Sequence, residues 1–142
     1  MPTLGLLLDN RSVFSVHTRQ TVLEVARHMS ALNVGAILVI DDGALKGLFS
    51  ERDLMTRVVV AGRGLDSTRV GEVMTQDLAV ADEHCSSEEA MALMRRAGCR
   101  HLPVLNGGDV VGLVSMRDLM NLELEEKAEE ITHMRSYIQS AC

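Results

Sequence analysis

The sequence predicts an α+β protein made of two copies of one β-α-β-β-α unit, followed by an extended C-terminal helix. The first observation behind this prediction is an internal repeat: GLFSERDLM at residues 47–55 returns as GLVSMRDLM at residues 112–120, 65 positions later. The second is that short apolar runs of strand length alternate with helical periodicity in the same order in both halves. The third is that neither glycine nor proline occurs after Gly112, so the last helix has no stop signal.

The first unit is predicted to span residues 8–64. Its first helix has Val22, Val25 and Met29 at helical spacing, and the sequence DDG between its last two strands is a tight-turn signal. The predicted elements follow one another as strand 13–16, helix 21–32, strand 36–40, strand 45–50 and helix 51–60.

The second unit is predicted to span residues 70–125 and to repeat this order. Gly98 stops its first helix, and NGG forms the turn between its last two strands. The segment 61–72 is rich in glycine and polar residues, which places the boundary between the units there. The predicted elements are strand 78–81, helix 86–97, strand 101–105, strand 110–115 and a helix from residue 116.

Each unit is too small to bury a comfortable core by itself. We therefore expect the two sheets to pack face to face about an approximate two-fold axis. Since 46% of the residues are hydrophobic and only 2% are aromatic, the core is expected to be aliphatic and filled with methionine.

Residues 119–140 are predicted to form an amphipathic C-terminal helix. Leu124, Ile131 and Ile138 recur every seven residues beside an acidic face. A helix with such an apolar stripe is stabilised when the stripe packs against another surface. Two alternatives stay open, because the helix can fold back on its own domain or pack against another chain.

The composition argues against several classes of function. A net charge of −6 and few aromatic side chains are poorly suited to binding a nucleic-acid polymer. The apolar runs at residues 4–8 and 58–62 are too short for a signal-peptide core or a membrane span, so no membrane association is expected. Three cysteines without CxxC spacing suit a reducing compartment, and we expect a cytoplasmic protein.

No spacing typical of a metal site or of a catalytic constellation occurs in the chain. His84 beside Cys85, and Cys99 near His101, would have to supply metal ligands from two unrelated loops. The sequence therefore predicts no metal ligand, no catalytic residue and no catalytic cofactor, and it does not predict an enzyme.

The repeated motif has two interpretations that remain open. Ser50 with Asp53, and Ser115 with Asp118, have the spacing of a helix capping box, which would need no ligand. A helix N-terminus is also a site for a phosphate, to which the serine hydroxyl and the guanidinium of Arg52 or Arg117 add donors, while a carboxylate can accept hydrogen bonds from a ribose diol. The second interpretation describes one end of a nucleotide.

The second unit carries more positive charge beside its middle strand than the first. Arg100 and His101 precede Pro103 there, whereas the first unit has Gly35 and Ala36 at the matching positions. Without the repeat, a surface or half-buried histidine would be the preferred interpretation of His101. If nucleotides bind, we expect two unequal sites, with a charged phosphate preferring the one that Arg100 and His101 serve.

The tandem units, with GLxSxRD in both and HLPV in the second, resemble a pair of cystathionine-β-synthase (CBS) domains, also called a Bateman module. The resemblance covers residues 8–125. It implies two clefts between the units that bind adenine nucleotides such as AMP, ATP or NAD. It also implies that Asp53 and Asp118 hold the ribose, that Ser50, Arg52, Ser115 and Arg117 approach phosphates, and that base or phosphate is contacted by Val34, Gly35, Ala36, Ile37, Arg100, His101, Leu102 and Pro103.

By this resemblance the chain is a stand-alone regulatory module that signals by conformational change to an unidentified partner protein. Paired CBS modules commonly dimerise, so the resemblance also implies a homodimer, which the C-terminal helix could extend. The alternative function is a ligand-free structural dimerisation or adaptor module, in which both motifs serve only as caps.

Overall fold

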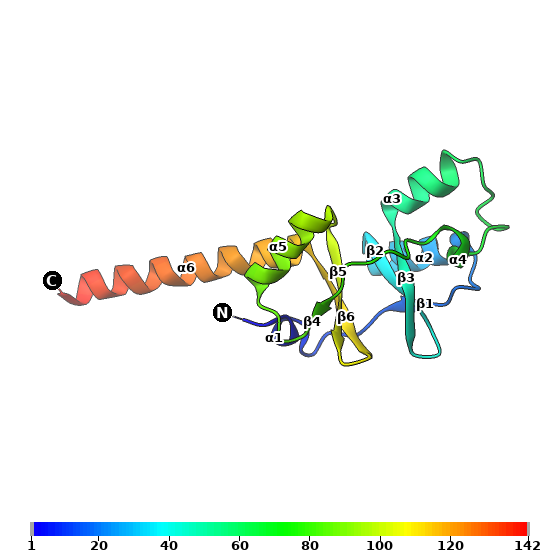
Figure 1. Cartoon of the computed structure of the whole chain (residues 1–142). Helices are drawn as coiled ribbons and strands as arrows, with labels where there is room; N and C mark the ends of the chain where they lie inside the picture. Colours follow the sequence, from blue (N-terminus) through cyan, green and yellow to red (C-terminus); the bar gives the residue numbers. More distant parts are fainter. Residues whose placement is uncertain (1, 142) are drawn as a thin grey trace.

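The computed structural model describes residues 2–141 and contains two three-stranded sheets, one in each half of the chain (Figure 1). The α+β class and the extended C-terminal helix are as predicted. The first half contains α1 (Leu4–Leu8), β1 (Ser15–Val16), α2 (Val22–Leu32), β2 (Ala36–Asp41), β3 (Ala44–Ser50), α3 (Glu51–Asp53) and the π-helix η1 (Leu54–Val59). The second contains α4 (Val70–Val73), β4 (Ala81–Asp82), α5 (Ser87–Ala97), β5 (His101–Asn106), β6 (Asp109–Ser115) and α6 (Met116–Ala141).

The two sheets repeat each other down to their hydrogen-bond register. In each, the first strand runs parallel to the second, and the second runs antiparallel to the third. Val39 lies opposite Gly47, Val104 lies opposite Gly112, and the register shifts immediately after each of these valines. The offset of 65 residues therefore describes a true structural duplication.

Local sequence signals set the ends of the two equivalent helices. Thr21 accepts a hydrogen bond from the backbone N–H of Glu24 at the start of α2, and Ser86 caps α5 in the same way. The helices end at Asn33 and Gly98, whose left-handed conformations release the chain into the next strand.

Apolar side chains fill a core in each half and a third cluster between the two sheets. Ala36, Leu38 and Leu48 of the first sheet are buried, and Leu78, Val110 and Leu113 from the second half pack against the same cluster. The strands β3 and β6 contact each other across this interface. The sheets therefore pack through their faces, because each supplies an apolar surface that the other removes from water.

Two short helices cross from one half of the chain to the other. The helix α1 packs against β6 of the second sheet, and its backbone N–H groups at Leu4 and Gly5 bond to carbonyls at Cys85 and Glu83. The helix α4 packs in the same way on β3, and Thr75 just beyond it exchanges two backbone hydrogen bonds with Leu48. Neither helix was predicted, because four or five residues are too few to show a helical period.

Three predicted elements differ from the structure. The strands expected at residues 13–16 and 78–81 pair only at Ser15–Val16 and Ala81–Asp82, because the chain ahead of each pair is still crossing between the two halves. The helix expected at residues 51–60 is one turn of α-helix followed by the π-helix η1, and its i→i+5 pattern shows in the bond from Val60 N–H to Met55 O.

The helix α6 extends far beyond the body of the molecule (Figure 1). Its start is anchored by the buried Leu119, whereas Leu124, Ile131, Met134 and Ile138 are all more than half exposed. The alternative in which this helix folds back on its own domain is therefore wrong. Within residues 2–141, no helix, α6 included, is long and apolar enough to cross a lipid bilayer.

The repeat offers a matched test of how closely the crossing helices approach the sheets. A methyl group added at Gly47 would lie 2.7 Å from both the Met74 Sδ and the Thr75 carbonyl oxygen, whereas one added at Gly112 would lie 3.2 Å from two methyl groups of Leu8. We expect Gly47→Ala to lower the free energy of unfolding by about 1–3 kcal/mol, because the Thr75 backbone cannot yield without breaking its bonds to Leu48. Gly112→Ala should cost less, because a leucine side chain can rotate. Urea unfolding of both variants measures this, and equal losses would contradict it.

Candidate functional site

Both copies of the repeated motif form complete capping boxes. At the start of α3, the Ser50 Oγ accepts the Asp53 N–H at 3.2 Å, and the Asp53 Oδ2 accepts the Ser50 N–H at 3.1 Å. At the start of α6, Ser115 and Asp118 make the same two bonds at 3.1 and 3.0 Å. The capping interpretation is thus confirmed at both positions, and any ligand would meet carboxylates that already serve a helix terminus.

The Asp53 carboxylate is enclosed by further partners. The Thr75 hydroxyl donates to it, at 3.0 Å from Oδ1 and 3.1 Å from Oδ2, and the Arg57 Nε lies 3.5 Å from Oδ1. Only 10% of the side chain is exposed. Both oxygens of this carboxylate are therefore engaged within the protein.

The Asp118 carboxylate is more open, with 28% of its side chain exposed. Besides the Ser115 N–H, it faces the Arg11 guanidinium, whose Nη1 lies 3.5 Å from Oδ2. Arg11 is itself half exposed. The two equivalent carboxylates thus differ in both the kind and the burial of their partners.

Asp118 lies in the wall of a cleft of about 1040 Å³, which is lined by residues of both halves of the chain. A cleft of this size lies at the upper end of the range found for small-molecule and cofactor sites. Eight of the residues predicted for nucleotide binding line it, namely Val34, Gly35, Ala36, Arg100, His101, Ser115, Arg117 and Asp118.

The other six predicted residues do not line this cleft. Ile37 and Leu102 are buried in the two cores, and Pro103 is buried in β5. Ser50 and Asp53 form the enclosed capping box of the first half, and Arg52 beside them is exposed. The structure therefore places the two copies of the motif in different surroundings.

Two charged residues that the sequence analysis missed belong to the cleft. Arg11 follows α1, and Glu51 lies beside the backbone of Gly35, where an added Cβ would come within 3.6 Å of its carboxylate. A signal for Glu51 was present, because it stands where the second copy of the motif has Met116. No signal marked Arg11, since its place depends on α1 crossing to the second half.

Apolar side chains line the cleft beside these polar groups. Val13 and Phe14 come from the stretch ahead of β1, Met29 comes from α2 and Leu54 comes from η1. Val13 and Phe14 are close to half exposed. The cleft therefore combines a charged region around Asp118 with apolar surface from the first half.

The surroundings of His101 in the cleft favour its neutral imidazole. Burial of its ring, the largest cause, lowers the pKa of His101 from its usual value, and the nearby Arg100 guanidinium lowers it further. The carboxylates of Asp118 and Glu51 act in the opposite direction without reversing the shift. A new negative charge in the cleft would therefore favour the protonated imidazole.

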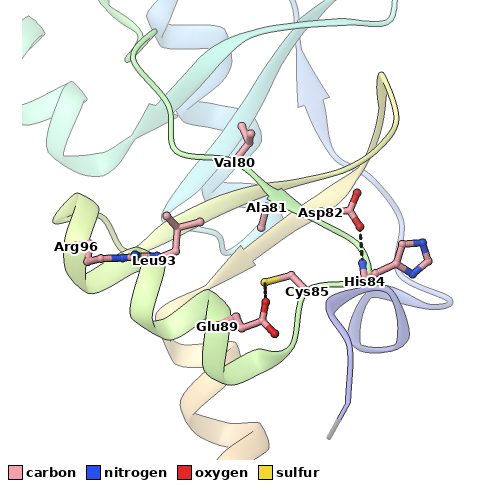
Figure 2. Close-up of a pocket in the computed structure, with 8 residues that line it drawn as sticks. All are labelled: Val80, Ala81, Asp82, His84, Cys85, Glu89, Leu93 and Arg96. Carbon is pink, nitrogen blue, oxygen red and sulfur yellow. Dashed lines mark hydrogen bonds between the residues drawn. The ribbon is translucent and has the colours of Figure 1, made fainter.

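A smaller hollow of about 430 Å³ lies on the second half, between β4 and α5 (Figure 2). The Cys85 Sγ is 3.8 Å from the Glu89 Oε2, and Figure 2 shows the His84 ring turned away from the thiol. Burial, with the Glu89 carboxylate beside it, raises the pKa of Cys85, so the thiol stays protonated and is a poor metal ligand. Over residues 2–141, no group of histidine, cysteine and acidic side chains is arranged to hold a metal ion.

Known proteins are similar to this chain in both sequence and fold. It is 38% identical over 107 residues to the CBS domain-containing protein YhcV of Bacillus subtilis. The alignment covers 75% of this chain and 76% of YhcV. The chain is 35% identical over 127 residues to the mitochondrial CBS domain-containing protein CBSX3 of Arabidopsis thaliana. That alignment covers 86% of this chain and 62% of the plant protein, so the chain spans less than two thirds of that relative.

Solved structures of other proteins have the same fold as this chain. A putative signal-transduction protein with CBS domains from Burkholderia ambifaria superposes with a TM-score of 0.82 at 34% identity, covering 87% of this chain and 94% of that one. The CBS domain protein PAE2072 from Pyrobaculum aerophilum, solved in complex with AMP, superposes with a TM-score of 0.73 at 28% identity, covering 82% and 88%. The family model of the CBS domain matches residues 8–60 and again residues 70–125. The chain therefore belongs to the CBS domain family and carries two copies of that domain in tandem.

Proposed function

We propose that this protein is a regulatory module that binds an adenine nucleotide in the Asp118 cleft. The observation that carries the proposal is the convergence of Ser115, Arg117 and Asp118 at the start of α6 with Arg100 and His101 in one open cleft. The complex of PAE2072 with AMP supports an adenosine ligand for this cleft. AMP, ATP and NAD all carry the sugar and phosphate that these side chains suit.

In this proposal each part of the nucleotide has its own partner. The Asp118 carboxylate accepts hydrogen bonds from the ribose hydroxyls, while the Ser115 hydroxyl and the Arg117 guanidinium approach the phosphate. Arg100 and His101 provide further positive charge for it. The adenine base meets the apolar wall that includes Val13 and Phe14, and the segment Val34–Ala36 closes the other side.

We further propose that the first copy of the motif is not a ready site of the same kind. Asp53 already accepts the Thr75 hydroxyl and lies next to Arg57, so a ribose would have to displace both. Ser50 and Arg52 would take part only if that enclosure opened, whereas Ile37, Leu102 and Pro103 are buried elsewhere in the protein and are not expected to contact a ligand. One nucleotide per chain is the resulting expectation.

The output of the module is a change of shape, not a chemical reaction. Because the cleft draws residues from both halves, a bound nucleotide favours the arrangement of the two halves in which it makes the better contacts. An unidentified partner protein reads that arrangement. The free thiols of Cys85 and Cys99 suit a reducing compartment such as the cytoplasm, although one relative is named a mitochondrial protein.

A homodimer is part of the proposal. The exposed Met55 and Val59 of η1 stand 65 residues before Met120 and Leu124 of α6, which are exposed as well. An apolar surface repeated in this way on both halves suits a second copy of the same chain, since a two-fold axis pairs like with like.

A second candidate function is a ligand-free adaptor, in which both motifs serve only as helix caps. The complete capping boxes at Ser50 and Ser115 favour it, because they account for both motifs without a ligand. The open cleft around Asp118 is what it leaves unexplained.

Ligand-induced stabilisation separates the two functions. The midpoint of thermal unfolding should rise by about 5 °C or more with AMP, ATP or NAD at roughly one hundred times its dissociation constant, because only the folded state binds. Asp118→Ala should abolish the rise. Asp53→Ala is the matched control and should keep it, while being less stable without ligand because it loses the Thr75 and Arg57 contacts. No stabilisation of the wild type at millimolar concentrations would support the adaptor.

Binding of AMP should take up protons near neutral pH. The pKa of His101 is lowered from its usual value, and a phosphate beside the ring would raise it, so the affinity should increase as the pH falls below neutral. Isothermal titration calorimetry in two buffers with different heats of ionisation measures the uptake. His101→Gln should remove most of it while keeping any contribution from AMP itself. An unchanged uptake in that variant would contradict the role given to His101.

The proposed dimer predicts a particle of twice the chain mass of 15.5 kDa in light scattering after size exclusion. Changing Val59 and Leu124 together to glutamate should yield monomers, because two charges would be buried at the interface. Leu6→Glu is the control, since Leu6 is equally exposed but lies on α1, outside the repeated surface. A monomeric wild type, or a dimer that survives the double change, would overturn this part.

A further inference from the structure

Arg11 is held in the second half of the molecule although it lies near the start of the chain. Leu4 and Leu8 of α1 are buried in the second core, and a Cβ added at Gly112 would lie 3.2 Å from both methyl groups of Leu8. After the helix, Asn10 adopts a left-handed conformation with a φ of 65°, and the Arg11 N–H bonds to the Leu8 carbonyl at 3.0 Å. The backbone at Arg11 is therefore fixed at the edge of the cleft.

The Arg11 side chain, by contrast, is held weakly. Its Nη1 lies 3.5 Å from the Asp118 Oδ2, and 46% of the side chain is exposed. Ion pairs as exposed as this one add little stability. The same Oδ2 atom also accepts the Ser115 N–H, so a hydroxyl that approached this carboxylate would compete with Arg11 more readily than with the backbone.

The equivalent place in the first half holds a different kind of group. Thr75 lies just beyond α4, as Arg11 lies just beyond α1, and each of the two crossing helices brings its residue to the aspartate of the other half. The Thr75 hydroxyl is neutral and bonds to an almost fully buried Asp53. Arg11 is charged, long and exposed, and it can find another anion when it leaves Asp118.

The charges within the cleft define what that anion would be. Arg11, Arg100 and Arg117 line the cleft together with two carboxylates, those of Asp118 and Glu51. When a sugar occupies Asp118, the guanidinium of Arg11 loses its counter-ion within a partly enclosed space. A phosphate on the same ligand would restore the balance with a charge-assisted pair.

We propose that Arg11 binds phosphate by exchanging one partner for another. The ribose hydroxyls of a nucleotide hydrogen-bond to the Asp118 carboxylate in place of Arg11, and the released guanidinium then pairs with the 5′-phosphate. The cleft thereby selects a phosphorylated nucleoside over the free nucleoside. The inference rests on the proposed function and adds to it a residue and a class of ligand.

The test compares AMP with adenosine by isothermal titration calorimetry on the wild type and on Arg11→Gln. The variant should bind AMP about tenfold more weakly, because it lacks the charged donor. Its affinity for adenosine should stay equal or increase, because no guanidinium competes for Asp118. Arg11→Lys, which keeps the charge without the planar fork, should fall between the two for AMP.

Arg63→Gln is the matched control, because Arg63 pairs with Glu72 at 2.9 Å and does not line the cleft. It should leave the affinity for both compounds unchanged, and urea unfolding verifies that each variant is folded. A wild type that binds neither compound overturns the proposed function itself. A wild type that binds AMP, with an Arg11→Gln variant that loses neither compound or both equally, overturns the role of Arg11 alone.

Discussion

The structure depends on the apolar contact between the two sheets, which joins two halves that each have a small core of their own. Leu38 and Leu48 of one sheet meet Val110 and Leu113 of the other, and this burial brings the two halves together. The crossing of α1 and α4 strengthens the dependence, because each half is completed by a helix that precedes the other half in the chain. The cleft is a consequence of this arrangement, since its walls belong to both halves and exist only while the sheets are packed.

The duplication keeps the backbone and changes the chemistry. Both motifs place a serine and an aspartate on a helix start with nearly identical distances, so the local sequence determines the cap wherever it occurs. Most of what differs comes from outside the motif. A half-buried threonine reaches Asp53 and an exposed arginine reaches Asp118, which leaves one carboxylate enclosed and the other at the edge of an open cleft. Unequal surroundings thus arise from the crossing segments, from Arg57 next to Asp53, and from Glu51, which replaces the Met116 of the second copy.

The sequence was sufficient for features that are encoded locally or that recur. The repeat, the capped helices and the hairpins could be predicted because Thr21, Gly98 and the glycine-containing turns act on their neighbours. It was insufficient where distant segments meet. The helices α1 and α4 are too short to have a period, the π-helix η1 has no known local signal, and the positions of Arg11 and Thr75 follow from the crossing, which no spacing along the chain reveals. Of the residues expected at the nucleotide site, eight line the cleft. Ile37 and Leu102 lie beside some of these residues in the sequence, but their side chains pack in the cores.

The position of the second motif also joins the candidate site to the longest helix of the molecule. Asp118 caps α6, and α6 continues from that cap to Ala141 with an exposed apolar stripe. A ligand that hydrogen-bonds to the Asp118 carboxylate must therefore share it with the N-terminus of α6. By linkage, a conformation of α6 that changes the position or hydrogen bonds of this carboxylate binds the ligand with a different affinity. A protein that contacts the stripe would be coupled to the cleft through this shared group, without requiring any movement of the two cores. The corresponding carboxylate, Asp53, caps a short helix that leads into η1, so the same motif in the first half has no comparable extension to act on.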